Sequence, residues 1–436
     1  MKKTMKRILG MTLAALMLVA MVAACAPAAP APPAGGGGAA AGGDGAAAGG
    51  GAADAPAGHH GYDINNVDTS DWVRLDMNYA TFLPAENAAM NLNWTNQLAV
   101  GQELMGEYFD FTLFPLGTLL SQGDSWEGVL AGTAPIAFVD FAITPELLPL
   151  TTLWSFPSNN VGGTVAATAA FNEWMNILQP AEFNDVVLLS VQAAAGTTLS
   201  TSFRWERMED LAGRQIGAMP ALHPTLTALG AIPVNIPTAD VYDAARSGLI
   251  EGMFWTIGAT VNVGAQTYLP YQWFSQMGTG HYLGVIMNRP FYESLPQTQR
   301  EFLREVFRRA MWERIVVQQP HRQDVFPPAL EALAAGQMEV FTIDPVEHQR
   351  MRDTVAYLRD DYVADLIARG VPDAQRAADL LDEMTDKWRG WYTMEKFMTP
   401  FLAAMEGDHQ RFIDDPSLMT PPPLPEVYGW TPSADR

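Results

Sequence analysis

Cysteine is almost absent from this 436-residue sequence, and basic residues are scarce. Cys25 is the only cysteine, so no disulfide can form within the chain and the fold must rest on its core. Lys and Arg number 26 against 48 Asp and Glu, a formal charge of −22. Nucleic-acid binding is therefore not expected, because phosphate contacts need a basic stripe. The acidic surplus is typical of a solvated surface and names no ligand.

Long apolar runs are absent outside the N-terminus. There, four cationic residues precede an apolar or small run over residues 8–24, which ends directly before Cys25. This pattern is typical of a secretory signal, and small residues before a cysteine resemble the bacterial lipobox, in which the thiol is acylated. We predict a lipoprotein signal peptide over residues 1–24 and a lipid anchor on Cys25. Loss of the four leader cations takes the charge from −22 to −26. A secreted protein cut elsewhere and a retained anchor helix are the alternatives.

The short motifs of common enzyme classes are also absent. We find no G-x-S-x-G elbow, no H-E-x-x-H motif, no Walker loop and no Rossmann glycine fingerprint. A cysteine used for the lipid is not free for thiol catalysis, and no body histidine has a partner at metal-ligand spacing. The sequence therefore predicts no enzyme activity, no metal and no cofactor.

Composition divides the rest of the chain. Residues 25–61 are almost entirely Ala, Gly and Pro and cannot form a core, so we expect a disordered linker with a reach of about 30–35 Å. The body is predicted over residues 62–420, long enough for two lobes. A proline run opens an extended tail over residues 421–436.

Hydrophobic periodicity predicts short strands that alternate with helices. Such alternation favours a mainly parallel sheet with helices on both faces. The predicted strands are residues 75–79, 109–114, 136–139, 186–192, 215–219, 252–255 and 285–287. The predicted helices are residues 86–105, 124–130, 164–178, 240–247, 296–319, 344–369 and 373–398, which makes the last third mostly helical.

The most informative stretch covers residues 208–303. It contains Asp210-Leu211-Ala212-Gly213, then Leu229-Gly230-Ala231-Ile232-Pro233-Val234, and then Asp240-Val241-Tyr242-Asp243-Ala244-Ala245. Gly248-Leu249-Ile250-Glu251-Gly252, Asn288-Arg289 and Phe291-Tyr292-Glu293-Ser294-Leu295-Pro296 follow. Their order and spacing resemble the solute-binding proteins of tripartite ATP-independent periplasmic (TRAP) transporters, the DctP-like family. The resemblance covers about residues 77–320.

The resemblance implies a fold and a function. The fold is α/β, a two-lobed periplasmic-binding-protein type II-like fold with interleaved lobes, a cleft between them and a helical C-terminal region. The function is capture of a small organic solute outside the cytoplasm and delivery to the TRAP membrane permease subunits. An ABC-type solute-binding lipoprotein, a surface hydrolase with a dispersed site and a sensor or adhesion lipoprotein stay as alternatives.

One position departs from the family pattern. Members that bind organic acids carry an arginine in the strand after the "D-L-x-G" turn, where it clamps a carboxylate. Gly217 stands at that position, and alternation turns Arg214 to the other face of the strand. We therefore predict an apolar, aromatic or sugar-like ligand, or an acid held by another cation such as Arg204.

The predicted ligand contacts lie at or near the ends of strands, where open α/β sheets bind ligands. Trp255 is the leading candidate, because an aromatic face gives a large contact area at low entropic cost. A core role is the alternative for each aromatic residue. The full set is Phe82, Glu86, Phe138, Asp140, Gln192, Gly217, Phe254, Trp255 and His281.

Overall fold

The computed structural model describes residues 62–85, 88–157, 161, 164–194, 196–275, 277, 282–313, 326–389 and 411. They all fall in one compact unit. The predicted signal peptide, the linker 25–61 and the tail 421–436 lie outside the described residues, so those boundaries stay predictions. Of the helices in these described ranges, none combines the length and the apolar character needed to cross a membrane.

Five strands form the first sheet, called sheet A, in the order β2-β1-β3-β10-β4. β1 pairs in parallel with β2 and β3, whereas β10 runs antiparallel between β3 and β4. The bounds are β1 Leu75–Thr81, β2 Phe109–Phe114, β3 Ile136–Asp140, β4 Val186–Ala193 and β10 Tyr282–Asn288. The parallel strands and β4 therefore all end at the same edge of the sheet.

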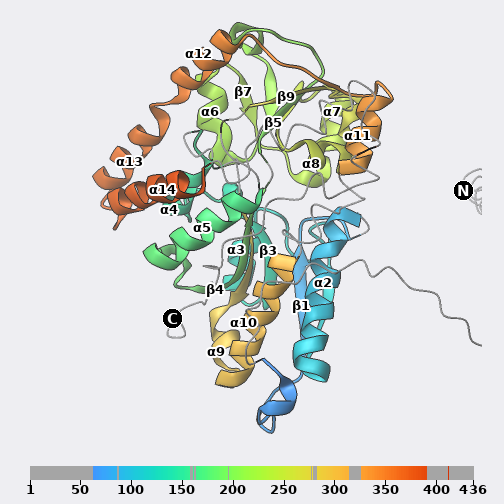
Figure 1. Ribbon diagram of the computed structural model, residues 1–436, viewed down its shortest axis with the longest axis vertical. Coiled ribbons are helices and arrows are strands. Elements are labelled where there is room, and N and C mark those ends of the chain that lie inside the picture. Colours follow the sequence, from blue (N-terminus) through green and yellow to red (C-terminus); the bar gives the residue numbers. More distant parts are fainter. Residues whose placement is uncertain are drawn as a thin grey trace, which may run out of the picture. The chain divides into compact units, whose positions relative to one another are not determined.

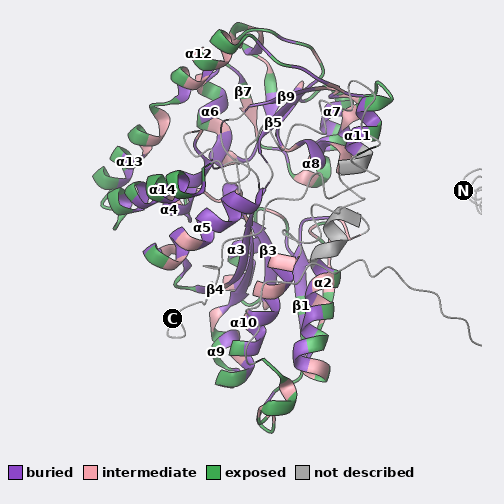
Figure 2. Ribbon diagram, viewed as in Figure 1, coloured by how far each residue is buried: buried purple, intermediate pink, exposed green. Residues whose placement is uncertain are grey.

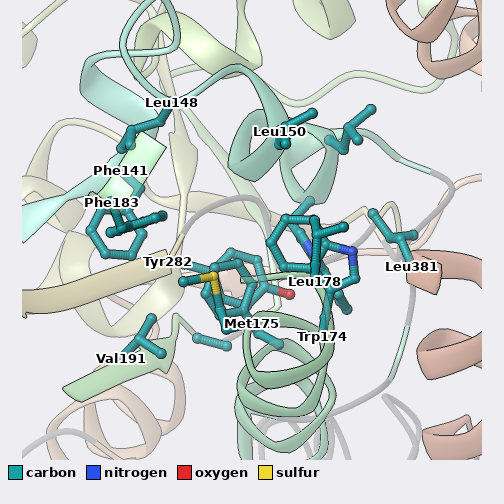
Figure 3. Close-up of a cluster of buried hydrophobic side chains, with 14 of the residues drawn as sticks. Phe141, Leu148, Leu150, Trp174, Met175, Leu178, Phe183, Val191, Tyr282 and Leu381 are labelled. Carbon is teal, nitrogen blue, oxygen red and sulfur yellow. The ribbon is translucent and has the colours of Figure 1, made fainter. Parts of the chain in front are cut away.

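Helices cover both faces of sheet A and make the first lobe with it. They are α2 Ala88–Met105, α3 Ser125–Leu130, α5 Thr164–Leu178 and α10 Gln297–Trp312. Alternation along β3 divides the core, because Ile136 and Phe138 belong to one hydrophobic cluster and Ala137 and Val139 to the other. Figure 3 shows part of the second cluster, in which Trp174 of α5 lies near Leu178 and Leu381.

Six strands form the second sheet, sheet B, in the order β11-β9-β5-β8-β6-β7. β5 is antiparallel to both of its neighbours, β8 and β9, while β6 pairs in parallel with β7 and β8. The bounds are β5 Thr198–Thr201, β6 Gln215–Gly217, β7 Ile232–Val234, β8 Gly252–Trp255, β9 Tyr271–Phe274 and β11 Glu339–Val340. With α6 His223–Ala228, α7 Val241–Ser247 and α8 Ile257–Asn262, this sheet makes the second lobe.

The chain passes between the sheets more than once. It leaves sheet A after β4 to enter β5, and it returns from β9 of sheet B to β10 of sheet A. Figure 1 shows the elements of the two sheets as separate groups. Buried residues follow the strands of both groups, while exposed residues follow the outer helices (Figure 2). The two lobes are thus interleaved in sequence.

Three C-terminal helices return to both lobes. They are α12 Pro345–Val355, α13 Leu358–Ala368 and α14 Ala374–Trp388. Met351 and Val355 of α12 belong to a core cluster of the second lobe. α14 packs against α5 of the first lobe, where Trp174 Nε1 donates to the carbonyl of Ala377 at 2.8 Å. Two further short helices are α9 Arg289–Glu293, which packs on β10 and β4, and α11 Phe326–Ala334, which packs against α8.

The sequence predicts most of these elements, with three corrections. The helix over residues 164–178 and the strands over 109–114 and 252–255 match their predicted bounds. The expected mainly parallel arrangement holds for most strands of the two sheets, with one exception in each, because β10 and β5 run antiparallel to both of their neighbours. The helix predicted over 344–369 is two helices, interrupted at residues 356–357, and β5, β7, β9 and β11 were not predicted.

Candidate functional site

Four of the predicted contacts meet at the carboxyl end of sheet A. Phe82 directly follows β1, and Phe138 and Asp140 lie at the end of β3. Leu283 of β10 pairs with Asp140 on one side and with Gln192 on the other. Because directly opposed residues share a face of a sheet, Asp140 and Gln192 lie on the same face. Strand pairing therefore gathers side chains that are far apart in sequence.

The two aromatic residues of this group are packed in the first lobe. The rings of Phe82 and Phe138 stack with centroids 6.1 Å apart, and Trp94 meets Phe138 edge-on at 5.6 Å. Phe82 is 5% exposed and Phe138 is 2% exposed. Both belong to a core cluster, so their contact with a solute stays a prediction.

The polar residues at this end have structural partners. Asp140 is buried and its Oδ1 accepts the Ala142 N–H at 3.0 Å, which starts the short helix η3, Phe141–Ile143. Gln192 is also buried, next to the last residue of β4. Their side chains place a carboxylate and an amide at this end of sheet A.

Three more of the predicted ligand contacts lie at the carboxyl end of the parallel strands of sheet B. Gly217 ends β6, and Phe254 and Trp255 end β8. Phe254 and Trp255 point to opposite faces, as alternation requires, and belong to different hydrophobic clusters. The Trp255 indole N–H donates to Thr260 Oγ1 at 2.6 Å, so this ring is held in place by α8.

Packing explains why glycine stands at position 217. A Cβ there would lie 2.5 Å from Met253 Sδ and 3.3 Å from Ile250 Cδ1. An arginine on β6 at this position would therefore have to displace Met253. The departure from the family pattern is built into the packing of sheet B.

The neighbouring arginines are held at the opposite end of sheet B. Arg204, which follows the carboxyl end of β5, pairs with Glu339 and lies over the Phe341 ring. Arg214, which precedes β6, pairs with Glu251 at 2.5 Å and lies 4.3 Å over the Phe203 ring. Neither guanidinium is at the end that carries Gly217 and Trp255.

A set of buried hydroxyl groups on and next to β5, β9 and α8 was not predicted from the sequence. Thr197 Oγ1 and Ser275 Oγ are 2.5 Å apart, and the Ser275 N–H donates to the Thr197 carbonyl at 3.1 Å. Ser200 Oγ lies 2.8 Å from Thr260 Oγ1 and donates to Gln272 Oε1 at 2.6 Å. The run of Thr and Ser over residues 197–202 was the signal available in the sequence.

A histidine supports the point where the chain leaves sheet B. His348 Nε2, on α12, donates to the Ser275 carbonyl at 2.7 Å. Burial lowers the pKa of His348, which favours its neutral form as a donor. α12 is therefore tied to the start of the segment that returns to sheet A.

Contacts between the two lobes include a hydrogen-bonded pair and a shared hydrophobic cluster. Gln122 Oε1 of the first lobe accepts the N–H and the hydroxyl of Thr238, at 3.1 and 3.3 Å. Ala142, just after β3, belongs to a cluster otherwise made of second-lobe residues, including Met219 and Trp255. Two predicted contacts, Glu86 and His281, lie outside the described residues.

Over the described ranges, no three His, Cys, Asp or Glu side chains are grouped so that they could hold a metal ion. The candidate site consists of two sets of strand ends with hydroxyl, amide, carboxylate and aromatic groups, and its role in binding stays a prediction. This arrangement can bind a small molecule by shape and hydrogen bonding.

Solved structures share this architecture. A TRAP solute-binding protein from Rhodoferax ferrireducens, with copurified benzoate, aligns with a TM-score of 0.64 at 20% identity, over 72% of this chain and 98% of that chain. A marine-metagenome protein with 3-hydroxybenzoate has a TM-score of 0.61 at 18% identity, over 72% and 99%. A Bordetella pertussis receptor for pyroglutamic acid has a TM-score of 0.61 at 18% identity, over 71% and 99%. The fold is thus the two-sheet binding-protein fold of TRAP solute receptors.

The family follows from the sequence match. The model of the bacterial extracellular solute-binding proteins, family 7 (DctP), matches residues 89–365, which is more than half of the chain. The chain belongs to this family. It is an extracytoplasmic solute receptor and not an enzyme.

Proposed function

We propose that this receptor holds a small organic solute between the carboxyl ends of sheets A and B and delivers it to the membrane subunits of a TRAP transporter. The observation that carries the proposal is the interleaved connection between β4 and β5 and between β9 and β10. Connections of this kind let two lobes close on a ligand by a hinge. We assign the contacts of Gln122 and Ala142 with the second lobe to the closed form in this proposal.

The solutes of the similar structures define the chemistry to test first. Benzoate, 3-hydroxybenzoate and pyroglutamic acid are small ring compounds with one carboxyl group. The aromatic residues Phe82, Phe138 and Trp255 at the strand ends suit a ring. We therefore propose a small ring solute for this receptor.

The receptor is proposed to be held at the outer face of the membrane by a lipid on Cys25. Support comes from the leader pattern and from the Ala/Gly/Pro composition of residues 25–61. A tether of this kind keeps the receptor near its permease. Mass spectrometry of the mature N-terminus tests this, and an unmodified terminus at another residue would refute it.

Solute binding can be tested by thermal stabilisation and calorimetry. A bound solute raises the midpoint of unfolding, because it binds the folded state alone. Benzoate, 3-hydroxybenzoate, pyroglutamate, orotate and succinate make a first panel. We expect stabilisation by at least one member without turnover of that compound. No stabilisation by any member, together with no small molecule in the native mass spectrum of the purified protein, would contradict a receptor function.

A further inference from the structure

One hydroxyl group on β5 differs from its neighbours. Thr197, Ser200 and Thr201 all form side-chain hydrogen bonds. Thr198 is 0% exposed, and its Oγ1 has no hydrogen-bond partner in the part of the chain that the structure describes. Burying a hydroxyl without a partner costs about 1–3 kcal/mol, so such a group calls for an explanation.

The strand pairing shows what surrounds this hydroxyl. Thr198 is the first residue of β5, and it pairs with Trp255 of β8 on one side and with Phe274 of β9 on the other. Directly opposed residues share a face of the sheet, with Cβ atoms about 4.5–5.5 Å apart. The Thr198 side chain is therefore flanked by two aromatic side chains at the carboxyl end of β8 and β9.

The described residues around this position offer no cation to an anionic partner. At this end of sheet B, the residues at the strand termini are uncharged; they are Met219, Thr197, Thr198, Trp255, Thr256 and Phe274. Gly217, on the same face of sheet B as Thr198, stands where acid-binding members of the family carry an arginine. The Met253 side chain fills the space beside it. At the facing end of sheet A, Asp140 adds a buried carboxylate. A carboxylate brought here would lose its hydration without gaining a cation, which is unfavourable.

We infer that Thr198 is the hydrogen-bonding contact of the second lobe for the solute, and that the solute presents an uncharged carbonyl or similar acceptor there on a ring. The Thr198 hydroxyl donates to this acceptor, and the side chains of Trp255 and Phe274 flank the ring. This inference rests on the proposed function, because it names the solute class of the same site.

Calorimetry with benzamide and benzoate tests the solute class, since the two probes differ in charge and share the ring. We expect wild-type protein to bind benzamide at least about tenfold more tightly than benzoate, because the site offers a hydroxyl and no cation. Equal or tighter binding of benzoate would overturn the inference. Binding of neither probe would also overturn it.

Three variants test the role of Thr198. T198V keeps the shape and removes the hydroxyl, so benzamide affinity should fall by roughly three- to tenfold, the range of one hydrogen bond. T198S keeps the hydroxyl and should bind as the wild type does. T201V is the matched control on the same strand, because Thr201 Oγ1 donates to the Phe203 carbonyl at 2.7 Å and points to the other face.

The stability of the solute-free variants separates a binding role from a structural one. T198V should unfold at the same temperature as the wild type or higher, because an unpartnered hydroxyl is removed, whereas T201V should unfold lower. A fall in stability for T198V with unchanged benzamide affinity would overturn the inference. The proposed function fails separately, when no compound of the organic-acid panel and no amide stabilises the wild-type protein.

Discussion

The carboxyl ends of the two sheets differ in how they place charge. Sheet A keeps Asp140 and Gln192 at the end that faces the second lobe. Sheet B places hydroxyls and aromatic rings there, and holds Arg204 and Arg214 in ion pairs at its other end. The same fold can therefore present a charged or an uncharged surface to a solute, depending on which strand end carries the ionisable residues.

The interiors of the two lobes differ as well. The first lobe contains a continuous group of rings, in which Phe171 stacks on Tyr282 at 4.3 Å and Trp154 meets Trp174 at 5.9 Å. Sheet B instead carries the hydroxyl network of Ser200, Thr260 and Gln272 on one face. Ring contacts therefore dominate the core around α5 in the first lobe, whereas buried side-chain hydrogen bonds join β5, β9 and α8 in the second lobe.

The largest effect is expected in the ring core of the first lobe. Trp174→Ala removes a fully buried side chain and its hydrogen bond to Ala377, so the free energy of unfolding should fall by about 3–5 kcal/mol. Urea unfolding measures this. Ile177→Ala on the same helix is the control, since Ile177 is 44% exposed and should change stability by less than about 0.5 kcal/mol. Equal effects would show that the ring core is not the support we describe.

A smaller effect is expected at Gly217. Gly217→Ala places a Cβ against Met253 Sδ, so overpacking should lower the free energy of unfolding by about 1–3 kcal/mol. Met253→Ala removes the obstructing atoms, so the double variant should lose less than the sum of the two single variants. Chemical denaturation of the wild type, the two single variants and the double variant gives the coupling free energy between residues 217 and 253. Strict additivity would mean that Met253 does not occupy the arginine position.

The titration of Glu182 and the titration of His348 should change the free energy of unfolding in opposite directions as the pH rises. Burial raises the pKa of the Glu182 carboxyl to about 7, although it accepts the N–H groups of Leu150 and Thr151 at the start of α4, Pro149–Thr152. Between pH 4.5 and about 7, the Glu182 carboxyl therefore keeps its proton in the folded state and has lost it in the unfolded chain. The stability from Glu182 is therefore full below pH 4.5 and is lost as the pH rises towards 7.

His348 acts in the other direction. Because the pKa of His348 is lowered in the folded state, the unfolded chain binds the proton more readily. The contribution of His348 to the free energy of unfolding is therefore full above pH 6.5 and is lost as the pH falls. Thermal unfolding from pH 4.5 to 8 measures both effects. Glu182→Gln should remove the loss of stability with rising pH, and His348→Asn the loss with falling pH. The same pH profile for both variants would contradict these assignments.

The smallest effect is expected at the contact between the lobes. Gln122→Ala removes the acceptor of the Thr238 N–H and hydroxyl, which weakens the closed form by about 0.5–1.5 kcal/mol. X-ray scattering without solute should then show a larger radius of gyration. Thr118→Ala is the control, because Thr118 bonds only locally, to the Pro115 carbonyl at 2.8 Å. A scattering curve identical to that of the wild type would refute the role of Gln122 in closure.

Local pattern allowed most elements of the first lobe to be predicted. The helix Thr164–Leu178 and the strand Phe109–Phe114 follow from apolar spacing. In the second lobe, α7 ends at Ser247, where the predicted helix ends, and Gly248 follows with a left-handed φ of 75°. β5 was missed because its Thr- and Ser-rich sequence resembles a loop. Its place in the sheet is set by pairing with β8 and β9, which are more than 50 residues away in the chain.

Strand ends allowed a candidate site to be predicted from the sequence, whereas the sequence could not specify which of its side chains lack hydrogen-bond partners. Phe82, Phe138, Asp140 and Gln192 meet as strand order requires. The unpartnered hydroxyl of Thr198 depends on long-range hydrogen bonds formed by its neighbours, which no local pattern encodes. The same holds for Gly217, whose meaning depends on Met253 of a neighbouring strand.

Hydrogen exchange with and without solute tests the central claim most directly. The solute should be the compound that gives the largest thermal stabilisation. We predict increased protection at both sets of strand ends, near Asp140 and Ala193 in sheet A and near Thr198, Trp255 and Phe274 in sheet B. Protection confined to one sheet, or located away from these strand ends, would contradict binding between the two lobes.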